Sequence, residues 1–452
     1  MSEAHPNIVE LSRKLISIDS TMGHGTVAAA QWLSDLARSW GLRSEIIEET
    51  WNGVGQANVL VSPSNIRAEE AQLLLSTRLD TPDPGEYATW TKTGANPFNA
   101  SVNGDQLFGL GARDSKLDFL CKLIAFKEIC GVCKPKATVL GTFGRESGMG
   151  AIRLIRQKKI KPRAALVGAP TGLRLATRAQ GYAKVEITLP LSSAERKYIE
   201  EQSISEGSYS QSKVFARRPD EKVVDLGLLD NPIIRMIDYL KNLPEGIAVL
   251  SIDGGTSAEA EPTFVELEVQ IVDHLQESVI RKLIAVGELI KRLAVELKTV
   301  NAPDFSPPHS TINVGQIRML NEEVKIVGVC RLVPTVDREV YEKWLERLRS
   351  DCAAAGAQFH ILDYKPPFSM ESEAPFFTLA KSVCSSLGLD SRGAAAHQCT
   401  EANIFHRLGI ETVVFGPGTE ANNEPAALEH VKINELKTAI EFYKSVLLQE
   451  GA

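Results

Sequence analysis

Three acidic residues lie just after segments that have the composition of buried strands. Asp80 follows residues 72–77, Asp114 lies in the sequence Gly-Leu-Gly-Ala-Arg-Asp-Ser-Lys at residues 109–116, and Glu146 follows residues 138–143. Ligands of open α/β sheets bind at the carboxyl ends of the strands, so we expect these acids to converge at one edge. The residues alone leave open a second interpretation, in which all three are solvated loop acids.

The segments that must position these acids alternate between strand and helix. Helical periodicity is found at residues 8–16, 26–40, 117–129 and 151–157, and strand-like segments at 44–47, 58–61, 72–76, 137–143 and 164–167. The same alternation returns after Phe376, with a strand at 413–415 and a helix at 433–447. This order predicts an α/β fold, with a mainly parallel sheet flanked by helices, built from residues 1–179 and 366–452.

Residues 180–365 have a different pattern, which predicts an inserted α+β domain. Strands are expected at 183–189, 264–272, 312–317, 324–329 and 359–363, and helices at 275–297 and 337–355. Strands and helices grouped in this way suggest an antiparallel sheet with helices on one face. The first helix has an apolar seam, formed by Leu275, Val279, Leu283, Val286, Ile290, Leu293 and Leu297. The seam fits either core packing or a helix that forms a homodimer through this domain.

Composition excludes several classes of partner. The chain has 50 basic and 57 acidic residues, a formal charge of −7, so it lacks the basic face that nucleic-acid binding needs. No apolar stretch approaches the ~20 residues of a membrane-spanning helix, and the N-terminal residues do not resemble a secretory signal. Seven cysteines are sparse and odd in number, as in proteins with reduced thiols. We therefore expect a cytoplasmic protein without nucleic-acid or membrane partners.

A series of short motifs follows in a fixed order along nearly the whole chain. The motifs are Ile16-Ser-Ile-Asp-Ser20, Leu79-Asp80 with Trp90 and Pro97-Phe98, residues 103–116, Arg145-Glu146-Ser-Gly148, Gly168-Ala-Pro-Thr171, Ile312-Asn-Val-Gly315, Arg331, Thr400-Glu401-Ala402 and Phe415-Gly-Pro-Gly418. Together they resemble the di-zinc amidohydrolases and exopeptidases typified by acetylornithine deacetylase, succinyl-diaminopimelate desuccinylase, aminoacylase and carboxypeptidase G. The resemblance implies a zinc-exopeptidase-like domain with an inserted lid or dimerisation domain, and amide hydrolysis assisted by two zinc ions.

The resemblance also assigns site residues. Members of this family bridge two zinc ions with an aspartate, give each ion one histidine and one further carboxylate, and use a glutamate as base. The bridging aspartate matches Asp114, one carboxylate ligand matches Glu146, and the aspartate that orients the first histidine matches Asp80.

Four of the family's positions carry other residues in this chain. Arg78 stands at the first histidine, Arg145 at the base, and Ala169 at the other carboxylate. The stretch at 419–425, where the second histidine is expected, has none, and Glu424 is the carboxylate there that we expect to offer a substitute.

Arginine cannot take the place of a histidine ligand, because its guanidinium has no available lone pair and stays protonated. If Arg78 and Arg145 enter the cavity, they neutralise Asp80, Asp114 and Glu146 through charge-assisted hydrogen bonds. This hypothesis predicts an arginine–carboxylate network without metal. In the alternative, both arginines point to solvent and the acids hold a single divalent metal, with Asp114, Glu146 and Glu424 as ligands. Such an all-oxygen set favours Mg²⁺ or Mn²⁺ over zinc.

The half of the family's site that binds the substrate carboxylate has matching residues here. The resemblance places the carboxylate-binding arginine at Arg331 and the loop amides at Gly416 and Gly418, with Asn313 as a further candidate. We therefore expect a protein that binds an amino-acid-like or peptide-like carboxylate without two-zinc hydrolysis. The alternatives are a divergent enzyme acting on an amide or acyl bond, either without metal, using the surviving acids or Cys399 with His397, or with a single metal.

Overall fold

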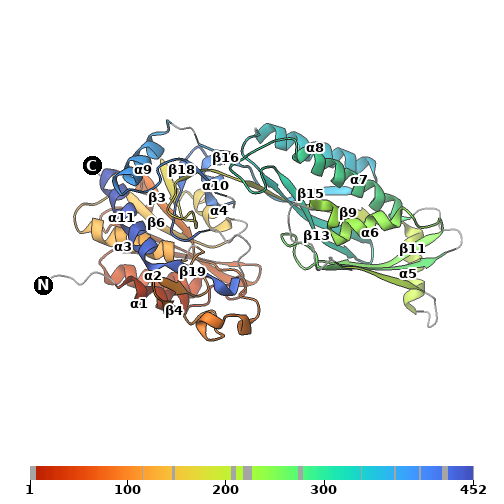
Figure 1. Cartoon of the computed structure of the whole chain (residues 1–452), viewed down its shortest axis with the longest axis horizontal. Coiled ribbons are helices and arrows are strands. Elements are labelled where there is room, and N and C mark those ends of the chain that lie inside the picture. The colour runs from red at the N-terminus through yellow and green to blue at the C-terminus, as the bar shows by residue number, and fades with distance from the viewer. Residues whose placement is uncertain are drawn as a thin grey trace. The chain divides into compact units, whose positions relative to one another are not determined.

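The structure is a computed structural model that describes residues 7–114, 116–144, 148–204, 210–216, 227–272, 278–336, 338–370, 373–396, 399–419 and 426–450. The chain forms two compact units (Figure 1). Unit 1 comprises Met1–Ala179 and Phe368–Ala452, and unit 2 comprises Gln180–Pro367.

Unit 1 is an α/β unit made from both ends of the chain. Its strands are β1 (Arg43–Trp51), β2 (Val54–Ser62), β3 (Leu73–Arg78), β4 (Ser101–Asn103), β5 (Gln106–Phe108), β6 (Ala137–Thr142), β7 (Ala164–Val167), β8 (Ala176–Ala179), β16 (Phe368–Ser369), β17 (Ala394–Ala396), β18 (Glu411–Val414) and β19 (His430–Lys432). Its helices are α1 (Ile8–Ile16), α2 (Val27–Ser39), α3 (Lys116–Cys130), α4 (Met149–Arg156), α9 (Pro375–Ser386), α10 (Glu401–Arg407) and α11 (Ile433–Glu450).

The central sheet of unit 1 has the strand order β1-β2-β6-β3-β7-β18-β8-β16, with β17 paired to β8. The sequence predicts a mainly parallel sheet, but the sheet is mixed. Strands β6, β3, β7 and β18 are parallel, whereas β1, β2 and β16 pair in the antiparallel direction. One reason is a tight turn between β1 and β2 at Asn52 and Gly53, where both residues have positive φ (49° and 80°). A two-residue Asn-Gly turn of this kind joins antiparallel strands.

Helices cover both faces of this sheet, and alternate strand residues contribute to each. Leu73 and Leu75 of β3 belong to a hydrophobic cluster with helices α1, α2, α3, α9 and α11, whereas Leu74 belongs to a second cluster with α4 and α10. This alternation follows from the two-residue period of a strand. Helix α3 contacts α1, α11, β3 and β6, and it lies beside α11 in Figure 1, so even the charged residues Lys116, Asp118 and Lys122 are buried. The predicted α/β fold flanked by helices is confirmed.

Unit 2 contains a seven-stranded, wholly antiparallel sheet in the order β10-β12-β11-β13-β14-β9-β15. Its strands are β9 (Gly181–Pro190), β10 (Gln211–Ala216), β11 (Ile247–Gly254), β12 (Phe264–Ile271), β13 (Thr311–Met319), β14 (Glu323–Leu332) and β15 (Gln358–Lys365). Its helices are α5 (Ser193–Ile204), α6 (Pro232–Leu240), α7 (Val279–Leu297) and α8 (Arg338–Ala354), of which α6, α7 and α8 lie over one face (Figure 1).

The apolar seam of the long helix is core in this structure. Six of its residues (Val279, Leu283, Val286, Ile290, Leu293 and Leu297) are buried in the hydrophobic core of unit 2, and Leu275 lies outside the described residues. This face of α7 is therefore not free to form a dimer, and a homodimer through the inserted domain stays a prediction. Among the described residues, no helix is long and apolar enough to cross a membrane.

Candidate functional site

The candidate site begins at the carboxyl end of β3. Arg78 is the last residue of this strand, and the parallel register pairs it with Thr142, the last residue of β6. Side chains alternate along a strand, so Ser76 and Arg78 follow Leu74 onto the face covered by α4 and α10, whereas Thr77 contacts α3 on the other face. At the end of β3, side chains on opposite faces of the sheet therefore make different polar contacts.

Arg78 forms an ion pair with Asp114. Its Nη2 atom lies 2.8 Å from Asp114 Oδ1, and the two residues are only 8% and 9% exposed. Asp80, two residues further along, accepts a hydrogen bond from the backbone N–H of Gly144 (3.1 Å) in the loop after β6. Arg78, Asp80 and Asp114 therefore lie at one edge of the sheet, whereas Glu146, the third acid of the predicted set, lies outside the described residues.

Glu429 supports the Asp114 loop from the opposite end of the chain. Strand β19 pairs with β5, and this pairing brings Glu429, which precedes β19, against the loop after β5. One carboxylate oxygen, Oε1, accepts the backbone N–H groups of Arg113 (3.0 Å) and Asp114 (3.1 Å). Burial, and then the negative charge of Asp114, raise the pKa of the Glu429 carboxyl to about 7. Glu429 thus takes up a proton near neutral pH.

Lys116, at the start of α3, is a second buried titratable group at this edge. Its ammonium donates to the carbonyl oxygen of Ile18 (2.6 Å). Burial lowers the pKa of Lys116 to about 8, and the nearby charges of Asp19 and Glu429 oppose this effect.

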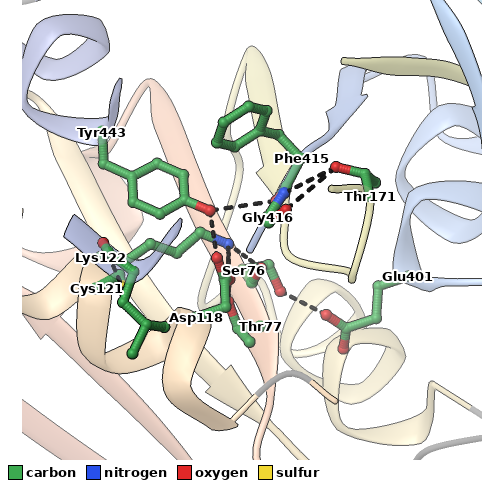
Figure 2. A network of polar contacts seen from close by, with 11 residues as sticks. Ser76, Thr77, Asp118, Cys121, Lys122, Thr171, Glu401, Phe415, Gly416 and Tyr443 are labelled. Carbon is green, nitrogen blue, oxygen red and sulfur yellow. Dashed lines mark hydrogen bonds and ion pairs between the residues drawn. The ribbon is translucent and has the colours of Figure 1, made fainter. Parts of the chain in front are cut away.

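Glu401, the first residue of α10, enters the site from the face that carries Arg78. Its Oε2 atom accepts a hydrogen bond from the Ser76 hydroxyl (2.5 Å), as Figure 2 shows. Burial raises the pKa of the Glu401 carboxyl, whereas the hydroxyls of Ser76 and Thr142 and the charge of Arg78 lower it. The carboxyl is positioned by the N-cap of α10, where Thr400 accepts the N–H of Ala402 (3.1 Å).

The two loop amides assigned to carboxylate binding are already donors within unit 1. The N–H of Gly416 donates to Thr171 Oγ1 (3.1 Å), and the N–H of Gly418 donates to Glu435 Oε2 (2.8 Å). A ligand carboxylate would have to replace these two acceptors. The assignment of Gly416 and Gly418 as binding residues stays a prediction.

The two candidate carboxylate-binding residues of unit 2 differ in whether their side chains already have hydrogen-bond partners. The Asn313 amide donates to the carbonyl oxygens of Ala258 (3.2 Å) and Ala260 (2.9 Å), so it is held within its own unit. Arg331, near the end of β14, is exposed, and its guanidinium has no hydrogen-bonding or ion-pair partner among the described residues. Of the two, Arg331 is the one with donors available to an anion.

Several predicted site residues lie outside the described part of the chain. They are Arg145, Glu146, Glu424 and His397. Among the residues that are described, no group of three or more histidine, cysteine, aspartate and glutamate side chains is arranged to hold a metal ion. Asp114 is in contact with a guanidinium instead, so the described donor set by itself does not fit a two-zinc centre.

The sequence matches one protein family over most of its length. The match is to the family described as "Peptidase family M20/M25/M40" and covers residues 77–449. The chain belongs to this family. Similar sequences include an acetylornithine deacetylase of Buchnera aphidicola subsp. Acyrthosiphon pisum (strain 5A), 23% identical over 391 residues, which cover 81% of this chain and 78% of the relative. An acetylornithine deacetylase of Salmonella paratyphi B is 27% identical over 187 residues, 38% of this chain and 45% of the relative.

Solved structures of the M20 type share the fold. A tripeptidase from Staphylococcus aureus aligns with a TM-score of 0.57 and 13% identity over 98% of both chains. An M20 metallo-carboxypeptidase from Sulfolobus solfataricus aligns with a TM-score of 0.56 and 14% identity, covering 98% of this chain and 99% of that one. At these identities the likeness concerns the fold.

Sequence reasoning missed Glu429 and the buried pair Asp118 and Lys122. Glu429 is 315 residues from Asp114, and only the pairing of β19 with β5 brings the two together. Asp118 and Lys122 had a usable signal, because opposite charges four residues apart lie inside the otherwise apolar run Leu117–Ile124. Charges in such a run are buried only if they are paired.

Proposed function

We propose that this member of the M20 family binds an amino-acid-like or peptide-like carboxylate and does not carry out two-zinc hydrolysis. One observation carries the proposal. The Arg78 guanidinium lies 2.8 Å from Asp114, and these are the positions that match the first histidine ligand and the bridging aspartate of the related hydrolases.

Charge and lone pairs together explain why this contact opposes metal binding. A guanidinium presents only donors and stays protonated at any pH at which the protein is folded, so it repels a divalent cation. The contact also occupies a carboxylate oxygen that a bridging ligand would need. Ala169, at the position of a further carboxylate ligand, has no side-chain donor atom at all.

The proposed ligand follows from Arg331 and from the relatives. An exposed guanidinium without a partner suits a carboxylate, with which it forms paired hydrogen bonds. Because relatives are named acetylornithine deacetylases, N-acetyl-L-ornithine is the first probe, followed by other N-acetyl amino acids and by dipeptides.

Metal analysis tests the absence of a two-zinc centre. The protein is purified without chelator, and its metal content is measured by inductively coupled plasma mass spectrometry. Hydrolysis of the probe panel is then measured with added Zn²⁺ and with a chelator, beside an authentic acetylornithine deacetylase. We expect no stoichiometric zinc and no turnover by this chain. Two zinc ions per chain with chelator-sensitive turnover would refute the proposal.

Ligand binding is tested separately by thermal shift and calorimetry. We expect the wild-type protein to bind a member of the panel, Arg331→Ala to lose most of this affinity, and Arg318→Ala to keep it. Arg318 is a suitable control because it is also an exposed arginine of unit 2, but it is paired with Asp253 (2.9 Å). If Arg331→Ala binds as well as wild type, Arg331 is not the anchor.

The same assays recognise the two alternative functions. One metal ion per chain with chelator-sensitive turnover would indicate a single-metal hydrolase at Asp114. Turnover that resists the chelator and is lost in Asp114→Ala or Cys399→Ala would indicate an enzyme without metal.

A further inference from the structure

The Asp118 carboxylate lies beneath the ends of three neighbouring strands. Its Oδ2 atom is 2.8 Å from Lys122 Nζ and accepts a hydrogen bond from Thr77 Oγ1 (2.7 Å), while its Oδ1 atom accepts the hydroxyl of Tyr443 (Figure 2). Lys122 also donates to the carbonyl oxygen of Ser76 (2.8 Å). One acid on α3 thus connects β3 with α11 in a site where water is excluded, since Asp118 is 3% exposed and Lys122 and Tyr443 are 0% exposed.

Two loops at the candidate site close directly onto this carboxylate. The Tyr443 hydroxyl is within hydrogen-bonding distance of the carbonyl oxygen of Phe415 (3.2 Å), at the end of β18. A Cβ atom added at Gly168, after β7, would lie 2.0 Å from Asp118 Oδ2, and one added at Gly416 would lie 3.2 Å from Oδ1. Asp118 therefore limits how closely the backbone of both loops can approach it.

A buried ion pair is a weak source of stability, so its presence calls for another reason. Removing two charges from water costs several kcal/mol per ion, and apolar residues of similar volume often serve the fold equally well. The directional contacts of such a pair do, however, permit few arrangements of the groups around it. Here those groups are the strand ends and loops of the site, because Gly416 in turn donates to Thr171 after β7 (Figure 2).

We propose that Asp118, together with Lys122 and Tyr443, is a positioning group for the loop Phe415–Gly418. The role of this positioning in ligand binding rests on the proposed function, because this loop contains the amides assigned to carboxylate binding. The positioning of the loop itself does not depend on a ligand. The network acts through the backbone of Phe415, and Tyr443 is its last member before the loop.

Hydrogen–deuterium exchange on the ligand-free chain tests the positioning. Tyr443→Phe removes only the hydroxyl, and we expect exchange in peptides covering residues 411–419 to accelerate about tenfold, the ratio that one lost hydrogen bond of ordinary strength allows. The control is Thr138→Val, which also removes a buried hydroxyl bonded to a neighbour (Ser62, 2.8 Å), at the far end of β6. The control variant should leave the exchange rates of these peptides unchanged. Unchanged exchange at 411–419 in Tyr443→Phe, or equal acceleration of all peptides, would overturn the inference.

A double variant separates positioning from stability. Asp118→Leu combined with Lys122→Met replaces the ion pair with apolar side chains, and we expect its midpoint of urea denaturation to be near that of wild type. Affinity for N-acetyl-L-ornithine, or for the panel member that wild type binds, should nevertheless fall about tenfold. Wild-type affinity in this variant would contradict the inference. If wild type binds no panel member, the proposed function fails, and the exchange experiment still decides the positioning role.

Discussion

The buried carboxyl of Glu429 makes the stability of unit 1 depend on pH. Its pKa is about 7 in the folded protein, against an ordinary value of 4.5, chiefly because it is buried and secondarily because Asp114 is near. At pH values below 4.5 both the folded and the unfolded states are protonated. As the pH rises from 4.5 to 7, the unfolded chain releases the proton while the folded chain keeps it, so the free energy of unfolding falls. At about 1.36 kcal/mol per pKa unit, the full loss is about 3 kcal/mol.

Glu429→Gln should remove this loss. Glutamine keeps an oxygen that accepts the N–H groups of Arg113 and Asp114 but has no proton to release, so the variant should be more stable than wild type near neutral pH. Urea denaturation at about pH 5 and at about pH 8 measures the difference, and the wild-type loss between them should exceed that of the variant by up to about 3 kcal/mol. Tryptophan fluorescence follows mainly unit 1, which holds four of the five tryptophans (Trp32, Trp40, Trp51 and Trp90).

The comparison of wild type with Glu429→Gln needs an upper pH limit and a control variant. Burial lowers the pKa of Lys116 to about 8, so this residue makes the protein more stable as the pH rises above that value. The pH range of the measurements therefore ends at about pH 8. Glu245→Gln is the control, because this side chain is 97% exposed in unit 2 and should not alter the pH profile. Parallel pH profiles for wild type and Glu429→Gln would refute the assignment of a protonated carboxyl at this position.

Three further predictions concern other parts of unit 1. Gly168→Ala places a Cβ atom 2.0 Å from Asp118 Oδ2, and we expect it to lower the free energy of unfolding by about 1–3 kcal/mol in urea titrations, as overpacked cores do. Thr400→Ala removes the side-chain cap of α10 and should cost about 1 kcal/mol in the same titrations, with Thr400→Ser close to wild type. Excess Zn²⁺ should leave the melting temperature unchanged, whereas a rise with zinc concentration would reveal a metal site at Asp114.

Local sequence patterns predicted many elements of the fold closely, but missed α5, β10, α6 and β11 of unit 2. The helical period from Ile8 to Ile16 corresponds to α1, and the apolar segment Ala164–Val167 corresponds to β7. Both succeed because the signal is the spacing of apolar side chains, which a single segment carries in full. The mixed character of the sheet was not predicted, because the composition of a strand does not give the direction in which it pairs; the Asn52-Gly53 turn makes β1 and β2 an antiparallel hairpin.

The site was predictable only in part, because its contacts join distant segments. Arg78, Asp80 and Asp114 were expected together, since strand ends and the family motifs placed them at one edge. No local pattern indicates that Glu429 supports the Asp114 loop or that Tyr443 reaches Asp118 across 325 residues of sequence. These contacts depend on which helix packs beside which strand, and that information is in the tertiary fold.

Charge compensation connects the site with the pH prediction. Asp114 is paired with the guanidinium of Arg78, and burial raises the pKa of Glu429 to about 7, so these two acids are balanced by an arginine and, below that pH, by a proton. A divalent cation at Asp114 would favour the ionised form of Glu429 by simple attraction and would flatten the predicted pH profile. Metal content and pH dependence must therefore agree. Stoichiometric metal with an undiminished pH dependence, or no metal with a flat profile, would each show that this account of the charge balance is wrong.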